Sequence, residues 1–393
     1  METDDFIVKR IPNVIRPWVV IVFGMVLQVS IGIDCTLGNI LPYVVSYLRW
    51  KVDPHLTYGH MIWLTVKIPV AMLFGGYLEK KIGCRKASII GAIMYTVMIG
   101  LSYFTIQQSF LLLLLTFDLL QNFGSGIVYN CVLINAQKWL PNRVGLASGL
   151  IVAGFGLGGF FISPLQTKYV NPKNLQTGSD SYFTQSEILE KVPPLFVVMA
   201  VCFGLAQMVA FLFMAEPKAT NEEEIQSRTS SHPINEKPNI LTIKEVLISN
   251  TFALLYATLF LNTVWCNTKD GLFKAYGLEF IHDDFFLAIL SSVSSVISCG
   301  SLIVYGILVD KVGYQKLMLI TCAIGSVFMW AIPGVRWVGN RYLYFFWICM
   351  MDTVNGATYT LLPYATNKLF GHDNFGIAYG LLMTSLVTFT FEQ

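Results

Sequence analysis

The sequence has few charged residues for its length. Of its 393 residues, only 13% are Asp, Glu, Lys or Arg, whereas 54% are apolar. A soluble globular protein of this size needs more polar side chains than that to cover its surface. The composition therefore argues against a soluble protein and predicts one that is embedded in a membrane.

The eight cysteines show no pattern of a disulfide framework or a metal site. They are scattered singly, nearly all within apolar runs, and no C-x-x-C pair occurs. Such cysteines usually pack as small apolar side chains. The net charge of +2 and the lack of a basic patch interleaved with aromatics also argue against a nucleic-acid partner. We expect no metal and no cofactor.

What the sequence does have is a series of eleven long apolar runs. A spanning helix needs roughly 20 mostly apolar residues to cross the hydrocarbon core of a bilayer. The runs lie near residues 17–41, 59–78, 87–106, 109–136, 145–165, 194–215, 251–273, 285–309, 316–334, 342–366 and 375–391. The first is too long for a cleaved signal and lacks a small-residue cleavage site, so we expect it to be retained. These runs predict an all-α, multi-pass membrane protein.

The distribution of Lys and Arg predicts how the chain is oriented. If the N-terminus is cytoplasmic, sixteen of the 26 Lys and Arg residues fall in cytoplasmic segments, as the retention of basic loops in the cytoplasm requires. Eleven crossings would then place Gln393 on the opposite side. We expect a plasma-membrane protein that acts as a monomer.

Two stretches that lie 230 residues apart repeat one short motif. They are "GYLEKKIGCRK" at 76–86 and "GILVDKVGYQK" at 306–316, and "GIVY" at 126–129 recurs with the same offset as "GATY" at 356–359. Two parallel repeats of six spans are typical of transporters that hold their ligand between the halves. The predicted segments are a cytoplasmic N-terminus (1–16), a six-helix half (17–215), a polar cytoplasmic linker (216–247) and a five-span half (248–393). Because a paired design has a twelfth span, we expect this chain to be a fragment or a short isoform.

The repeated motif predicts a latch between helix ends. Its glycines would let helices approach closely, and its charges can cap helix termini or form ion pairs. Asp310 supplies the acid of the second copy, whereas Lys80 stands at that place in the first. The residues assigned to this gating motif are Gly76, Lys80, Lys81, Gly83, Arg85, Gly306, Asp310, Lys311 and Gly313.

Several further stretches carry a resemblance to a known family. They include "GNILPYVVSYLR" (38–49), "KWLPNRVGLASGL" (138–150), "QTKYVNP" (166–172) and "FKAYG" (273–277). With the repeated motif, they resemble the oxalate:formate antiporter-like, monocarboxylate-type branch of the major facilitator superfamily. The resemblance implies a non-enzymatic secondary transporter that carries a small organic anion across a lipid bilayer by alternating access. A carrier of another solute, or a protein that has lost its site, are the alternatives.

The resemblance also implies a cation in the eighth span, four residues before Gly306, where this chain has Leu302. The cation we place inside a span is Lys67, about 13 Å below the outer boundary at 1.5 Å per residue. Buried charges in membranes usually have a function. Lys67 could anchor the anion, form a fixed ion pair with Asp118 or Asp34, or extend its ammonium group to the membrane surface.

Asp352 lies in a span that contains no basic residue. It is therefore predicted either to exchange a proton or to hydrogen-bond with Asn355 or Thr353. We place Lys269 and Lys274 at the outer rim. Polar and aromatic candidates for the substrate site come from spans one, four, seven and ten, and Tyr129 and Tyr359 stand out because they are repeat counterparts. The candidates are Asn39, Tyr43, Gln121, Asn122, Tyr129, Asn262, Trp265, Asn355 and Tyr359.

Overall fold

The computed structural model describes residues 5, 7–57, 60, 70–173, 175, 182–217, 243–278, 280–281 and 284–386. This described part is helical and contains no strand, which confirms the all-α prediction. Its longer helices are α1 (Arg16–Ile31), α2 (Leu37–Lys51), α3 (Val70–Ile82), α4 (Cys84–Thr105), α6 (Gln121–Trp139), α7 (Val144–Val170), α9 (Val192–Phe213), α12 (Asn250–Leu278), α13 (Asp284–Val312), α14 (Tyr314–Val338), α15 (Arg341–Phe370) and α16 (His372–Met383). The short ones are η1 (Val8–Arg10), η2 (Gly32–Thr36), α5 (Phe110–Leu113), η4 (Leu114–Leu120), η5 (Pro141–Arg143), α8 (Ser186–Leu189), α11 (Ile243–Ile248) and η6 (Thr384–Leu386).

Each of the eleven apolar runs coincides, at least in part, with a described helix. Within the described residues, seven helical segments are long and apolar enough to cross a membrane by length and composition, and a shorter apolar helix covers Asn374–Met383. Lipid cannot hydrogen-bond with the backbone, so apolar runs in a bilayer must satisfy their own N–H and C=O groups as helices. The chain is therefore a multi-pass membrane protein.

Two of the spans contain an irregular turn. The first apolar run is broken after α1 by the 3₁₀ turn η2, and α2 then continues to Lys51, ten residues beyond the predicted end. Gly32 begins this turn where the chain passes α7, because an added Cβ would lie 2.6 Å from the carbonyl oxygen of Phe155. In the fourth run, the π-helical turn η4 precedes α6 and contains Asp118. Such turns often mark hinges or functional positions.

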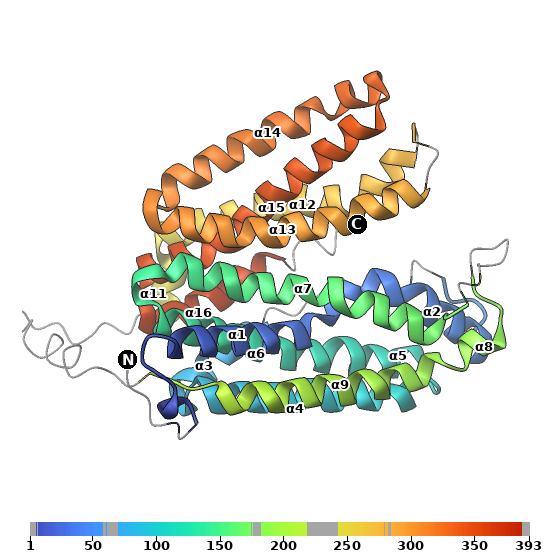
Figure 1. The fold of residues 1–393 in the computed structure, drawn as a ribbon, viewed down its shortest axis with the longest axis horizontal. Helices are drawn as coiled ribbons and strands as arrows, with labels where there is room; N and C mark the ends of the chain where they lie inside the picture. The colour runs from blue at the N-terminus through green and yellow to red at the C-terminus, as the bar shows by residue number, and fades with distance from the viewer. Residues whose placement is uncertain are drawn as a thin grey trace, which may run out of the picture.

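The long helices form two groups, as Figure 1 shows. Helices α1, α3, α4, α6, α7 and α9 lie side by side in one group. The other group consists of α12, α13, α14 and α15, with α16 packed on α15. The groups approach each other at the end where α11 and α16 lie and separate toward the end where α2 and α8 lie. We call these the closed end and the open end. The predicted division of the chain at 216–247 stays a prediction, because most of that linker lies outside the described residues.

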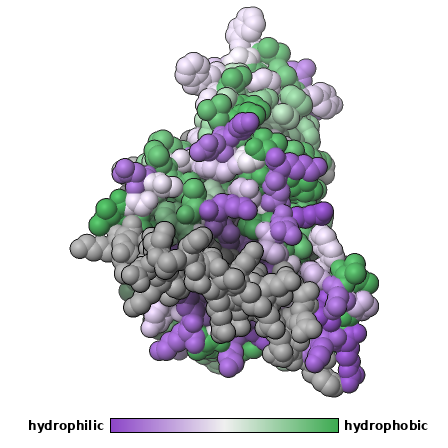
Figure 2. Space-filling view, turned by 90° about the vertical axis from the view of Figure 1, so that its left-hand side faces the viewer, coloured by the Kyte–Doolittle hydropathy of each residue, from purple (hydrophilic) through white to green (hydrophobic). Residues whose placement is uncertain are grey.

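Polar side chains gather on the face of the closed end, which Figure 2 shows between apolar flanks. Exposed basic residues of the helix turns contribute to this end, and they are Lys80, Lys81, Lys86, Lys311 and Lys316. The apolar flanks are the surface that a bilayer would cover.

Two crossings between the helix groups seal the closed end. Helix α7 crosses α13 where Gly145 meets Gly306, since a Cβ added to Gly145 would lie 2.5 Å from the carbonyl oxygen of Gly306. Helix α3 crosses α16 where Gly76 meets Gly376, and here an added Cβ would lie 2.6 Å from the Gly376 oxygen. Glycine is needed at these positions because the two backbones touch.

Candidate functional site

A cavity of about 980 Å³ opens between the two helix groups. Its walls come from η2 and α2, from the C-terminal part of α7, and from α12, α13 and α15. Spans five and eight therefore line the cavity, whereas span four, which the sequence analysis favoured, contributes no described lining residue. The α7–α13 crossing explains this, because its glycines bring these two helices together directly below the cavity.

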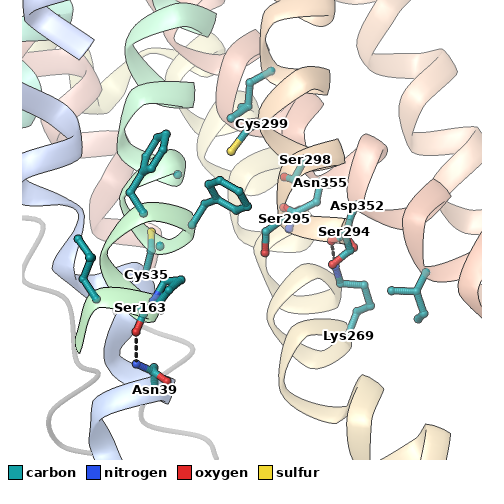
Figure 3. Close-up of a pocket in the computed structure, with 18 residues that line it drawn as sticks. Cys35, Asn39, Ser163, Lys269, Ser294, Ser295, Ser298, Cys299, Asp352 and Asn355 are labelled. Carbon is teal, nitrogen blue, oxygen red and sulfur yellow. Dashed lines mark hydrogen bonds and ion pairs between the residues drawn. The ribbon is translucent and has the colours of Figure 1, made fainter. Parts of the chain in front are cut away.

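The charged group of the cavity is an ion pair between Lys269 of α12 and Asp352 of α15, drawn in Figure 3. Both side chains are almost fully buried, with 3% and 8% of their surface exposed. Among the described lining residues, Lys269 is the one cation and Asp352 the one acid. Buried charges in a membrane protein are stable only when they are paired or hydrated.

This ion pair corrects two expectations from the sequence. Asp352 does have a basic partner, contributed by another helix, and Lys269 does not lie at the outer rim. The depth estimate is wrong because the span was taken to end near residue 273. Helix α12 continues to Leu278, nine residues beyond Lys269, which places Lys269 about 13 Å from the C-terminal end of its helix at 1.5 Å per residue.

Hydroxyl and amide groups surround the ion pair on the same wall. Ser294, Ser295 and Ser298 of α13 line the cavity, and Asn355 lies one helical turn after Asp352 on α15. In Figure 3, Ser294, Ser295 and Asn355 lie close to the Lys269 and Asp352 side chains. Such groups can donate hydrogen bonds to a carboxylate, and Lys269 can supply its countercharge.

The opposite wall, formed by η2, α2 and α7, is less polar. Asn39 donates from Nδ2 to the backbone oxygen of Ser163 at 3.0 Å. Its Oδ1 accepts a hydrogen bond from Thr167 Oγ1 at 3.1 Å. Phe160 and Phe161 of α7 contribute aromatic surface. The two walls therefore differ: one carries the ion pair and the serines of α13, and the other carries the amide of Asn39 and apolar rings.

Asp310 bridges the two groups at the α7–α13 crossing. Its carboxylate accepts hydrogen bonds from the backbone N–H groups of Gly145 at 2.9 Å and Leu146 at 3.0 Å. These N–H groups belong to the first turn of α7, where the helix dipole favours a negative charge. Asn367 adds a bond across the groups, donating to Gln137 Oε1 at 2.8 Å.

The first copy of the motif makes a different set of contacts. Lys80 donates to Asn374 Oδ1 at a long 3.4 Å, while Glu79 pairs with Lys138 at 2.6 Å within its own group. Arg85 pairs with Asp5, and its backbone N–H donates to Glu216 at 2.8 Å. The remaining motif positions are Lys81 and Lys311, which are exposed, and Gly83 and Gly313, which both adopt φ 88° at the turn between two helices.

The repeat-related tyrosines lie between the closed end and the cavity. Tyr129 is buried and meets Phe155 edge-on, with ring centroids 5.5 Å apart, and Phe155 directly precedes the cavity-lining Gly156. Tyr379 of α16 lies next to both Tyr129 and Tyr359. Tyr129 and Tyr359 therefore both lie next to Tyr379 and do not line the described cavity. Their contact with substrate stays a prediction.

The other predicted residues are dispersed. Gln121 is buried in the first helix group, and Trp265 donates to Asn262 Oδ1 at 3.0 Å, away from the described cavity lining. Asp118 is buried and accepts from Asn122 Nδ2 at 3.0 Å, with Asp34 nearby in η2. Lys67 lies outside the described residues, so its proposed pairing with these two acids stays a prediction.

Lys269 was not among the predicted site residues, although the sequence contains a signal for it. Lys269 follows Asn39 by 230 residues, the offset that relates the two motif copies, and both residues line the cavity.

Comparisons with known proteins agree with this architecture. The chain is 24% identical to apicoplast pyruvate carrier 1 of Toxoplasma gondii over 457 aligned residues, covering 94% of this chain and 81% of the relative. It is 24% identical to the oxalate:formate antiporter of Oxalobacter formigenes, covering 80% and 68%. Among solved structures, the proton:xylose symporter XylE matches with a TM-score of 0.67 at 10% identity, covering 97% of this chain and 88% of that one, which shows the shared fold.

A family match completes the assignment. Residues 37–388 match the sequence profile of the Major Facilitator Superfamily. This range contains both copies of the motif, both crossings and all described residues of the cavity except Cys35, which precedes it. The chain is a transporter rather than an enzyme, and it belongs to the major facilitator superfamily.

Proposed function

We propose that this protein is a secondary transporter of small monocarboxylates that works by alternating access. The observation that carries the proposal is Lys269, a buried cation in a cavity between two helix groups. An anion that leaves water for a dry site needs a countercharge and hydrogen-bond donors. Lys269 and the hydroxyl-bearing wall of α13 supply both.

The names of the relatives support this class of substrate. Two apicoplast pyruvate carriers and an oxalate:formate antiporter are among the proteins that this chain resembles. Pyruvate and formate carry one carboxylate each. By analogy, the transport would be either exchange of one anion for another or cotransport with a proton, for which Asp352 is the candidate in the cavity.

The sealed end and the Lys-rich turns that surround it support an orientation. Basic loops are retained in the cytoplasm, so we propose that the closed end, the N-terminus and the linker are cytoplasmic. The cavity would then face outward, in the plasma membrane of the host cell. Epitope tags at the N-terminus and after Lys173 test this orientation: in intact cells, only the tag after Lys173 should bind antibody.

A counterflow experiment tests the transport activity itself. Purified protein is reconstituted into liposomes loaded with unlabelled pyruvate, and uptake of labelled pyruvate, formate, lactate or oxalate is followed. We expect exchange of at least one monocarboxylate and weaker exchange of oxalate. An imposed proton gradient should drive net uptake if transport is proton-coupled and should have no effect on a pure antiporter.

Two outcomes would contradict the proposal. Exchange of neutral solutes, with no competition by monocarboxylates, would indicate a carrier of another solute class. A correctly reconstituted protein that exchanges none of the four anions would favour a non-transporting member of the superfamily.

A further inference from the structure

The Lys269–Asp352 pair places a carboxylate on the cavity's ammonium group before any substrate is present. Lys269 is held by α12 and Asp352 by α15, so the pair joins two helices across the cavity wall. The side chain of Asp352 ends in the same group as a monocarboxylate. Any such substrate that enters the cavity must compete with Asp352 for Lys269.

We propose that Lys269, Ser294 and Ser295 form the carboxylate subsite of this carrier, and that Asp352 occupies the subsite until a substrate carboxylate replaces it. This inference rests on the proposed transport of small anions. It assigns a binding role to three residues and the role of an internal competitor to a fourth.

The surroundings of the pair favour exchange of one carboxylate for another. Ser294 and Ser295 line the cavity from α13, and Figure 3 shows Ser294 beside the ion pair and Ser295 projecting into the cavity, so their hydroxyls can donate to a newly bound anion. Asn355, on the same helix as Asp352, can donate through its amide. A substrate carboxylate at this point would find the ammonium and the donors already positioned.

Replacement leaves Asp352 buried without its cation, and a bound proton removes that charge. The described titratable groups that face Asp352 are Lys269 from α12 and Cys349 from its own helix. Helices α13 and α7 present described hydroxyl, aromatic and glycine positions to the cavity, and no described charge. One anion on Lys269 and one proton on Asp352 therefore restore neutrality, and the subsite accommodates one carboxylate.

The position of the subsite also sets the orientation of the substrate. Its carboxylate lies on the wall made by α12, α13 and α15, so the rest of the molecule points toward α7. There the described lining includes Gly159, Phe160 and Phe161. A short solute with one carboxylate and a small apolar end fits these two walls, whereas a second carboxylate would lie against the aromatic rings.

The test uses the full chain, purified, with pyruvate as the probe in two measurements. One is counterflow in proteoliposomes, and the other is the shift in melting temperature that pyruvate produces in detergent. Lys269→Gln should lose both, with affinity reduced about 100-fold, because the subsite lacks its charge. Asp352→Asn should keep counterflow, bind pyruvate about tenfold more tightly because the competitor is gone, and lose uptake driven by a proton gradient.

Two further variants separate binding from folding. Lys269→Gln leaves the Asp352 charge buried without its cation, which should lower abundance. Lys269→Gln with Asp352→Asn removes both charges and should restore abundance without restoring pyruvate binding. Ser294→Ala with Ser295→Ala should weaken binding about tenfold. Ser326→Ala on α14 and Lys316→Gln at the closed end are the matched controls, and neither should change pyruvate binding.

The two measurements distinguish the inference from the proposed function. If the doubly neutral variant binds and exchanges pyruvate like the wild type, the pair is only structural and the inference is wrong, while transport stands. If pyruvate stabilises the wild type and not Lys269→Gln, yet nothing is exchanged, the subsite stands and the transport proposal fails. If the wild type neither binds nor exchanges pyruvate, both are rejected.

Discussion

The two crossings at the closed end are repeat counterparts that share their shape and differ in their charge. In both, a motif glycine of one helix group touches a glycine of the other, Gly306 on Gly145 and Gly76 on Gly376. At the α7–α13 crossing the motif itself supplies an acid to a helix terminus, where Asp310 accepts from two backbone N–H groups of α7. At the α3–α16 crossing the corresponding residue is Lys80, which reaches a side chain, Asn374, at 3.4 Å.

The difference shows which property of the motif each residue supplies. The glycines set how closely the backbones approach, and the approach is similar with and without the acid: an added Cβ lies 2.5 Å from the facing carbonyl oxygen at Gly145 and 2.6 Å at Gly76. The acid adds an electrostatic bond to a helix terminus, and one crossing has this bond while the other lacks it. Glu79, the acid that directly precedes Lys80 in the sequence, instead pairs with Lys138 in its own group. The closed end is therefore held more firmly on the α7–α13 side.

The largest expected effect comes from replacing a crossing glycine. Gly145→Leu and Gly76→Leu each place a side chain where the partner backbone lies, and overpacking of this kind costs about 1–3 kcal/mol. At the upper value the closed state loses roughly 100-fold in population. Counterflow should fall for both variants, and amide hydrogen exchange at the closed end should accelerate. Equal losses of counterflow in the two variants would confirm that close backbone packing matters equally at both crossings. Gly334→Leu on α14, where no neighbour lies within 4 Å of an added Cβ, is the control.

A smaller effect is expected from removing the charge at one crossing. Asp310→Asn keeps the size of the side chain but loses the ionic bond to the first turn of α7, which is worth about 1–2 kcal/mol. The amides of Gly145 and Leu146 should exchange about tenfold faster, which mass spectrometry of the peptide that spans them can measure. Lys311→Gln, an exposed neighbour in the same motif, should leave these rates unchanged. Unchanged amides in Asp310→Asn would show that the bond contributes nothing to closure.

The smallest expected effect is a gain in helix stability at the α3–α16 crossing. Lys80→Asp puts an acid near the start of α16, which begins at His372 without a side-chain cap. A charge at that position stabilises a helix terminus by about 0.3–1 kcal/mol, so hydrogen exchange in the first turn of α16 should slow by about two- to fivefold. The same substitution should not affect the first turn of α7. Faster exchange in α16 would mean that Lys80 itself holds the crossing.

The fold could be predicted because it depends on features that a sequence displays directly. Apolar runs of sufficient length become helices in lipid wherever they occur, and the repeat at an offset of 230 indicated a parallel design. The break between α1 and α2 was not predicted, because it depends on Gly32 passing close to Phe155 of α7, a contact between residues more than 100 positions apart in the chain.

The site was predicted less well, for a reason of geometry. Whether Lys269 reaches Asp352 depends on how far α12 extends and on how α12 and α15 are rotated about their axes, and apolarity specifies neither. The candidates Asn355 and Asp352 do line the cavity, while Tyr129 and Tyr359 gather below it around Tyr379. The 230-residue offset between the repeats, applied to Asn39, would have predicted Lys269 as a cavity residue.

The 3₁₀ turn η2 divides the first span into two rods that can tilt separately. Helix α1 packs on α7, α6 and α9, whereas α2 contacts α7 and α8 near the open end, with Cys35 and Asn39 of the cavity at the junction. A short 3₁₀ segment has poorer hydrogen bonds than an α-helix and is a natural bending point. Tilting of α2 alone would cover a bound solute while Asp310 remains on α7. If the carrier works by the proposed alternating access, enclosure of the solute and release of the Asp310 contact would be separate steps, with an intermediate closed on both sides between them.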